Sequence, residues 1–144
     1  MQRKPGGYRQ PTIKQRKLSM LSKEEFGSWF AQFWNIHGAS TKEHPAPFPL
    51  ELSYRLVRMF SFVGDTVLDP FLGSGTTMLA AMKAGRNSIG LDIEPHYLGM
   101  ARRNFQQQKR ALFLSAELTE KDYLQPSGAE HAKINQRTCD TSLV

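Results

Sequence analysis

A glycine-rich turn that follows a short apolar run is the strongest structural constraint in this chain. The run is Thr66-Val67-Leu68, and residues 69–77 continue as Asp-Pro-Phe-Leu-Gly-Ser-Gly-Thr-Thr. A short apolar run bounded by turn residues is typical of a buried strand, and glycine lets a backbone approach a ligand closely. We therefore predict a strand, a ligand-binding loop and a helix in direct succession.

A second acidic residue supports a ligand site at this loop. Asp92 ends another apolar stretch, Asn87 to Leu91. In nucleotide-binding α/β units, an acid about 20 positions after the loop binds the ribose hydroxyls. The pair of motifs therefore predicts a nucleoside-containing ligand.

The spacing of the loop residues separates three candidate cofactors. A dinucleotide fingerprint needs a third glycine where this chain has Met78, and a phosphate-binding P-loop needs a lysine that does not follow Gly75. Asp69 offers a carboxylate, which suits a cationic amine or a hydroxyl better than a pyrophosphate. S-adenosylmethionine carries both groups and no phosphate, so it is the predicted cofactor.

These motifs resemble those of the amino-methylating DNA methyltransferases, which act on adenine N6 or cytosine N4, in the permuted order that places the cofactor half after the catalytic half. Residues 69–77 resemble the cofactor loop, and Gly90-x-Asp92-Ile93 resembles the acidic strand end that holds the ribose. Residues 42–49, Lys-Glu-His-Pro-Ala-Pro-Phe-Pro, resemble the segment over the methionine side of the ligand. The resemblance extends roughly over residues 30–106.

The resemblance implies an α/β fold, namely a partial Rossmann-like S-adenosylmethionine-dependent methyltransferase fold with a parallel sheet and flanking helices. It also implies that Asp92 binds the ribose and Asp69 the methionine ammonium. Taken singly, Asp69 could instead cap the helix that starts at Thr76 or pair with a lysine, and Asp92 could be a turn residue after a strand. Phe71 and Tyr97 could flank the adenine or belong to the core. The implied cofactor-binding residues are His44, Phe48, Pro49, Asp69, Pro70, Phe71, Gly73, Ser74, Gly75, Thr76, Asp92 and Ile93.

One motif of the family is absent from the sequence. Its members carry Asp/Asn/Ser-Pro-Pro-Tyr/Phe/Trp, which binds the target amine and stacks on the flipped base, but this chain contains no Pro-Pro pair. We therefore assign no catalytic residue and expect the cofactor-binding half of a DNA methyltransferase that is not active alone. The alternatives are a subunit of a split methyltransferase, an inactive truncated remnant and a noncatalytic nucleic-acid-binding module.

The charge distribution predicts DNA as a partner. The chain has 144 residues, a formal net charge of +6 and a pI near 9.7, and a basic protein favours polyanions. Six cations lie within the first 17 residues, which contain no acid, and are expected to contact phosphates: Arg3, Lys4, Arg9, Lys14, Arg16 and Lys17. They define a basic extended arm at residues 1–21, which precedes a partial cofactor-binding domain at 22–114 and a polar, mobile tail at 115–144.

The remaining composition excludes several classes of protein. No apolar run approaches the roughly 20 residues that span a bilayer, and no signal peptide is evident, so we expect a cytoplasmic protein. Cys139 is the only cysteine, which excludes an internal disulfide. The histidines, His37, His44, His96 and His131, lack metal-binding spacing, so we predict no metal site.

Periodicity and capping signals predict alternating helices and strands. A capping box, Ser22 with Glu25, starts a helix that extends from Lys23 to about Phe33, and its aromatic residues at helical spacing are expected in the core: Phe26, Trp29, Phe30 and Phe33. The other predicted helices are 50–60, 76–84 with Gly85 as the C-cap, and 95–108. The predicted strands are 66–69, 88–92 and 111–114. The resemblance implies that the strand at 66–69 has a second neighbour in the family, the strand that leads into the catalytic motif, and that neighbour is missing here. We therefore expect an exposed apolar edge at 66–69 and either instability, self-association or dependence on a complementary catalytic chain.

Overall fold

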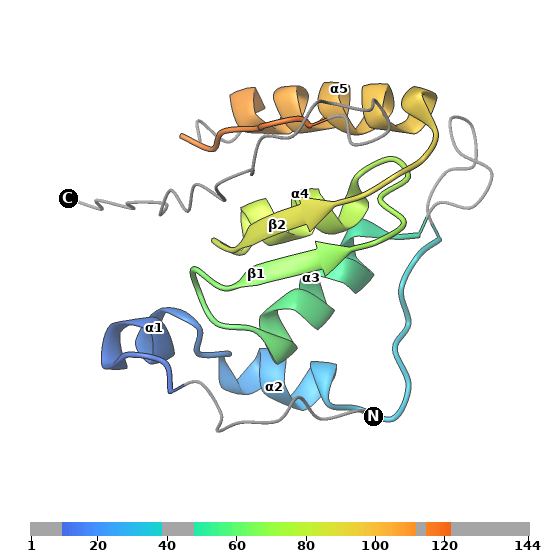
Figure 1. Cartoon of the computed structure of the whole chain (residues 1–144). Coiled ribbons are helices and arrows are strands. Elements are labelled where there is room, and N and C mark those ends of the chain that lie inside the picture. The colour runs from blue at the N-terminus through green and yellow to red at the C-terminus, as the bar shows by residue number, and fades with distance from the viewer. Residues whose placement is uncertain (1–9, 39–47, 112–114, 122–144) are drawn as a thin grey trace, which may run out of the picture.

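The structure, a computed structural model, describes residues 10–38, 48–111 and 115–121. Helices and strands alternate from residue 50 onward (Figure 1), which confirms the predicted α/β class. The elements are α1 (Ile13–Leu18), α2 (Lys23–Trp29), α3 (Leu50–Phe60), β1 (Thr66–Asp69), α4 (Thr76–Lys83), β2 (Asn87–Gly90) and α5 (Pro95–Ala111).

The two strands form a parallel pair that α4 connects. Thr66 pairs with Asn87, and the register runs on to Asp69 opposite Gly90. The carboxyl ends of the two strands therefore meet at one edge of the sheet, and the predicted loop and Asp92 follow directly from that edge. This edge is where ligands bind in open α/β sheets.

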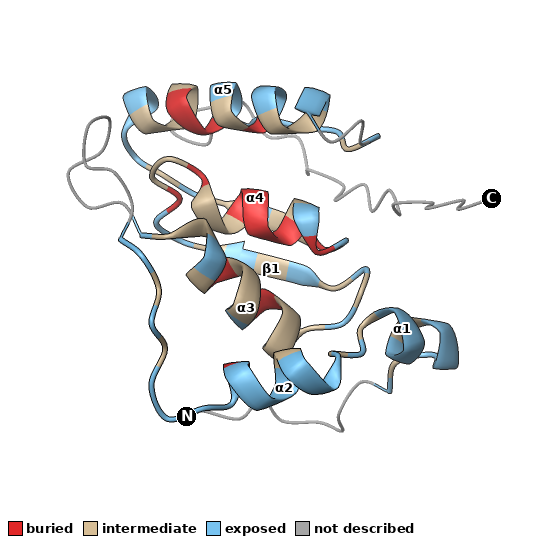
Figure 2. Cartoon of the chain, turned by 180° about the vertical axis from the view of Figure 1, so that it is seen from behind, coloured by how far each residue is buried: buried red, intermediate tan, exposed pale blue. Residues whose placement is uncertain are grey.

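The helices α3 and α4 cover one face of this sheet (Figures 1 and 2). Ala80 and Ala81 of α4 are completely buried, and Ala80 packs with Val57 of α3. A second cluster joins α4 to α5: Leu72, Met78, Leu79, Ala101 and Phe105. The small side chains of α4 allow the neighbouring helix and the sheet to approach it closely, so most of the core forms around this helix.

None of the described helices packs on the opposite face of the sheet. Leu68 and Ile89 are register partners on this face and are 61% and 51% exposed. Within the described residues, β1 pairs with β2 alone. The expected unpaired edge of β1 and its exposed apolar side chain are therefore present among the described residues.

The prediction of an extended N-terminal arm is wrong for residues 13–18, which form α1. Thr12 and Gln15 make a capping box that satisfies amides of the first turn. The Gln15 side chain also donates to the Val63 carbonyl at 3.0 Å, and the Val63 amide donates to Ser19 Oγ at 2.8 Å. Local capping and contacts with the turn before β1 thus outweigh a composition that predicted an extended segment.

The helix α2 starts as predicted but is shorter and buries fewer aromatic side chains. The capping box of Ser22 and Glu25 is present, and the helix ends at Trp29, not near Phe33. Trp29 is 9% exposed, whereas Phe26 and Phe30 stack on each other with their ring centroids 4.6 Å apart and remain exposed, as does Phe33. The predicted burial is wrong for these three phenylalanines because α2 contacts α3 through its Trp29 side.

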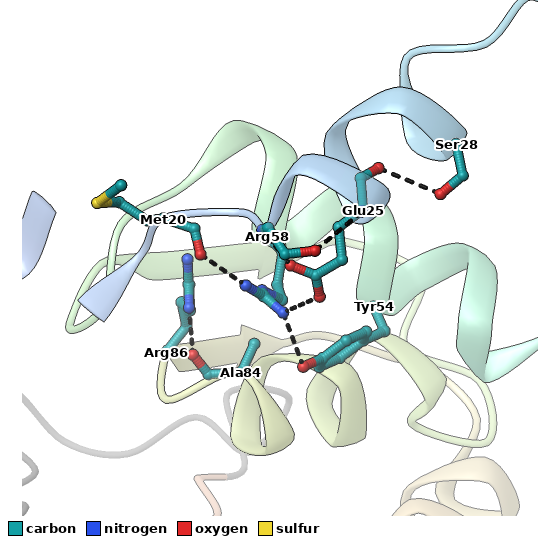
Figure 3. Close-up of polar contacts among 8 residues, drawn as sticks. Met20, Glu25, Ser28, Tyr54, Arg58, Ala84 and Arg86 are labelled. Atoms are coloured by element: carbon teal, nitrogen blue, oxygen red, sulfur yellow. Dashed lines mark hydrogen bonds and ion pairs between the residues drawn. The ribbon is translucent and has the colours of Figure 1, made fainter. Parts of the chain in front are cut away.

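Arg58 of α3 joins the N-terminal helices to the sheet domain (Figure 3). Its guanidinium donates to Glu25 Oε1 at 2.5 Å and to the Met20 carbonyl at 3.0 Å, and it lies 5.4 Å from the centre of the Trp29 ring. These charge-assisted bonds and the cation–π contact hold α2 against α3.

Arg86 makes a second connection, between the end of α3 and the start of β2. It is 6% exposed, and it donates to the Ser61 carbonyl at 2.7 Å and to the Ala84 carbonyl. Burial lowers the pKa of Arg86, and the positive charge of Arg58 lowers it further. Backbone carbonyls thus accept hydrogen bonds from this buried guanidinium, and the negative charge of Asp65 acts in the opposite sense and raises its pKa.

The remaining predicted helices and strands lie where they were predicted, and some of them differ at their ends. The bounds of α3 and β1 are as predicted, α4 ends one residue early with Gly85 at a φ of +70° just beyond it, and β2 starts at Asn87 and ends at Gly90. Ala111 ends α5, so it does not begin a third strand, and residues 112–114 lie outside the described part. None of the described helices is both long and apolar enough to cross a membrane.

We predict that Arg58→Met lowers the free energy of unfolding by about 1–3 kcal/mol, because Glu25 Oε1 and the Met20 carbonyl lose the donor they share. Methionine retains an apolar stem beside Trp29. The matched control is Arg102→Met, which breaks the exposed ion pair with Glu120 and should change stability by less than about 0.5 kcal/mol. Urea unfolding followed by circular dichroism measures both, and equal losses would contradict the prediction.

Candidate functional site

The glycine loop turns back over the carboxyl end of β2. The Leu72 amide donates to the Leu91 carbonyl at 2.8 Å, and the Gly75 amide donates to the Leu72 carbonyl at 2.9 Å. Gly73 and Gly75 have φ values of +52° and +85°, a left-handed region that L side chains rarely adopt. The loop therefore needs glycine at both positions.

Asp92 joins the loop to the start of α5. Its Oδ2 accepts the Gly73 amide at 2.8 Å, and its Oδ1 accepts the Glu94 amide at 2.9 Å. A carboxylate has about four lone-pair sites, so both oxygens can also accept hydroxyl donors from a ligand. The half-buried carboxylate of Asp92 therefore holds the glycine loop and the turn into α5 together.

Asp69 organises the first turn of the loop. Its Oδ1 accepts the Phe71 amide at 3.0 Å. The alternative that Asp69 caps α4 is wrong, because Gly75 is the N-cap of that helix and receives no side-chain cap bond. The carboxylate stands at the end of β1, on the same edge of the sheet as Asp92.

Apolar side chains lie uncovered around the two acids. Phe71 and Ile93 are 86% and 87% exposed, and Leu91 is also exposed. The core alternative for Phe71 is therefore wrong. Residues 69–77 and 90–99 contain no lysine or arginine. The site thus offers carboxylates, glycine backbone and apolar surface, which fit a ligand with hydroxyls, an ammonium and an aromatic ring and do not fit a pyrophosphate.

Close packing holds the loop against β2 and α5. A Cβ added at Gly90 would lie 2.5 Å from Leu72 Cδ1, so the missing side chain of Gly90 makes room for Leu72. A Cβ at Gly75 would lie 3.0 Å from Ala101 Cβ. Packing therefore favours glycine at both 75 and 90, and Gly75 also has a positive φ.

Sequence reasoning missed Asn104. Its Nδ2 donates to the Ser74 carbonyl at 3.0 Å, across 30 positions of the chain. The available signal was a polar residue on the apolar face of the predicted fifth helix, between Ala101 and Phe105, which are both buried.

The other predicted cofactor-binding residues occupy several places. Thr76 is the first residue of α4, its Oγ1 lies 3.4 Å from Ser74 Oγ, and Pro70 is exposed in the loop. Phe48 is exposed and Pro49 is the N-cap of α3. His44 lies outside the described residues. No group of three potential metal ligands occurs among the residues that the structure describes.

The predicted phosphate-binding cations lie far from this edge. Lys14, Arg16 and Lys17 are exposed on α1, which contacts Val63 before the start of β1. The strand β1 has four residues and so spans about 13 Å, and α1 lies beyond its amino end (Figure 1). These cations and the loop are at opposite ends of the sheet; Arg3, Lys4 and Arg9 are outside the described residues.

Comparison with known proteins identifies similar sequences. The DNA methylase family matches residues 3–103. The Type II methyltransferase M.MjaI of Methanocaldococcus jannaschii is 52% identical over 85 residues, which are 55% of this chain and 28% of that protein. The Type II methyltransferase M.MthZI of Methanothermobacter thermautotrophicus is 42% identical over 106 residues, which are 66% of this chain and 30% of that protein.

A solved structure shares the fold. It is a protein of Thermus thermophilus that has been assigned as a DNA modification methylase and was crystallised with S-adenosyl-L-methionine. The TM-score is 0.63 at 51% identity, and the match covers 74% of this chain and 41% of that one. The present chain therefore spans less than half the length of these relatives.

We predict that Gly75→Ala is more destabilising than Gly85→Ala. Both alanines would occupy left-handed backbone, at a cost of about 1–2 kcal/mol each. Only the alanine at 75 would also crowd Ala101, because the nearest atom at Gly85 is 3.7 Å away, so it should lose about 1–3 kcal/mol more. Urea unfolding of the two variants tests this, and equal losses would show that the loop does not pack tightly on α5.

Proposed function

The chain belongs to the DNA methylase family, and on this premise we propose that it binds S-adenosylmethionine at the edge formed by the glycine loop and Asp92. The observation that carries the proposal is the bond between the Gly73 amide and the Asp92 carboxylate. This bond joins the glycine loop to the acid that follows the second strand, which are the two motifs that the sequence spacing linked. It lies at the edge where open α/β sheets bind ligands.

Each part of the site has a role that suits this cofactor. The free lone pairs of Asp92 accept the ribose hydroxyls, and Asp69 binds the methionine ammonium directly or through water. Phe71 and Ile93 offer exposed apolar surface to the adenine, and the backbone at 73–75 forms the floor of the site. When bound, S-adenosylmethionine supplies the activated methyl group, and the protein holds and orients it.

We further propose that the methyl acceptor is an exocyclic amine of DNA, adenine N6 or cytosine N4, on a flipped base. The sequence lacks the Pro-Pro tetrapeptide that binds such an amine. The amine-binding group must therefore come from outside these 144 residues.

The uncovered face of the sheet supports the proposal that a complementary part, which carries the catalytic group, packs on this chain. Leu68 and Ile89 form an apolar surface at the centre of the sheet, and β1 pairs with β2 alone among the described residues. Burial of this face by a complementary part would remove apolar surface from water. Self-association through the same face is the alternative, and an inactive remnant would leave it open.

A nucleic-acid-binding role of the basic segment is the second candidate. The exposed cations Lys14, Arg16, Lys17 and Lys23 favour it, because lysine and arginine bind phosphates without reading sequence. Their position at the far end of the sheet implies contacts with DNA that are separate from the methyl-transfer site.

We predict that the chain binds S-adenosylmethionine and that Asp92→Ala weakens this binding by about 1–3 kcal/mol, because charge-assisted hydrogen bonds to the ligand are no longer made. Calorimetry measures both. The matched control is Asp65→Ala, because Asp65 accepts the Phe62 amide in the turn before β1 and should leave the affinity unchanged. A folded wild-type chain that binds no ligand at millimolar concentration would overturn the proposal.

We predict that changing Lys14, Arg16 and Lys17 together to glutamine weakens binding to duplex DNA and flattens its salt dependence, by about 0.9 in slope for each phosphate that is no longer neutralised. These substitutions leave the Gln15 contact with Val63 intact, which a deletion would remove. Glutamine at Lys83, Arg103 and Arg110 removes the same charge from the other elements as a control. Filter binding across salt concentrations distinguishes the two triple variants, and equal slopes would show that net charge alone matters.

A further inference from the structure

A side chain on α5 holds the centre of the glycine loop. Asn104 is half-buried, and its amide nitrogen donates to the carbonyl oxygen of Ser74 at 3.0 Å. Ser74 lies between Gly73 and Gly75, the two residues with positive φ. Asn104 thus contacts the most pliable part of the loop from an element 30 positions away.

This bond fixes one end of a peptide unit whose other end is also held. The unit joins Ser74 to Gly75: its carbonyl accepts from Asn104, and its N–H donates to the Leu72 carbonyl at 2.9 Å. A peptide unit next to glycine rotates at little steric cost. Without Asn104, the Gly75 amide alone would oppose rotation of this unit.

The same face of α5 adds a steric restraint. Ala101 is one turn before Asn104 and 2% exposed, and its Cβ would lie 3.0 Å from a Cβ at Gly75. Phe105 anchors this face in the core at 5% exposure. The rigid packing of α5 gives the Asn104 amide a defined position from which to orient the loop.

We propose that Asn104 is a positioning residue for cofactor binding, which acts by orienting the Ser74 carbonyl and with it the floor of the site. This inference rests on the proposed binding of S-adenosylmethionine. A ligand binds more tightly to a loop that is already ordered, because less conformational freedom is lost on binding. Asn104 itself contacts the loop and not the ligand.

The sharpest variant is Asn104→Asp, which keeps the shape of the side chain and replaces the donor with an oxygen that repels the Ser74 carbonyl. The loss of one hydrogen bond should raise the dissociation constant for S-adenosylhomocysteine about tenfold. Asn104→Gln retains an amide donor and should recover part of the affinity. Calorimetry on the full chain gives these constants.

Asn87→Asp is the matched control. The side-chain Nδ2 of Asn87 donates to the Gly64 carbonyl at 3.2 Å, at the amino end of the sheet, so this variant makes the same chemical change away from the loop. It should destabilise the fold to a similar degree and leave the dissociation constant unchanged. Equal affinities for Asn104→Asp and wild type would overturn the inference.

Amide hydrogen exchange provides a readout that does not depend on the cofactor. The Gly75 amide should exchange faster in Asn104→Asp than in wild type or Asn87→Asp, because rotation of its peptide unit breaks the bond to Leu72. An unchanged rate would also overturn the inference. Failure of the wild-type chain to bind S-adenosylhomocysteine would instead overturn the proposed function. The exchange rate of the Gly75 amide would still test whether Asn104 orients the loop.

Discussion

The hydrogen bond from the Gly73 amide to the Asp92 carboxylate is the interaction on which the candidate site depends. It spans 19 positions of the chain, and it forms because the parallel register of β1 and β2 brings the two strand ends together. The same carboxylate accepts the Glu94 amide and so fixes the entry to α5. One acid thereby ties the loop, the second strand and the following helix together, and its remaining lone pairs stay available to a ligand.

The packing around α4 explains how such a short sheet can hold this geometry. Each strand has four residues, and two short strands alone are not stable in water. The buried face of α4, with Ala80 and Ala81 fully enclosed, brings α3 and the sheet close to this helix, while Met78 and Leu79 contact α5. The geometry of the site therefore depends on the helices that pack behind the sheet more than on the hydrogen bonds of the sheet itself.

The two faces of the sheet have different surroundings. Helices pack on one face, and Leu68 and Ile89 are open on the other. The chain covers 28% and 30% of two related methyltransferases and 41% of a solved one. An apolar face of an α/β sheet is rarely left in water, so the open face supports the proposal that a complementary part covers it.

The sequence by itself determined the local units: the strand, loop and helix at 66–83, the capping box at Ser22, and the acid that follows the second strand. These depend on backbone conformation and on contacts between near neighbours, which residue type and spacing encode. Only the tertiary structure decided that Trp29, and not Phe26 or Phe30, is buried, because the buried side of an aromatic helix depends on what it packs against. It also decided that Asn104 holds the loop and that the cations of α1 lie at the opposite end of the sheet, because contacts between residues distant in the chain arise from the packing of whole elements.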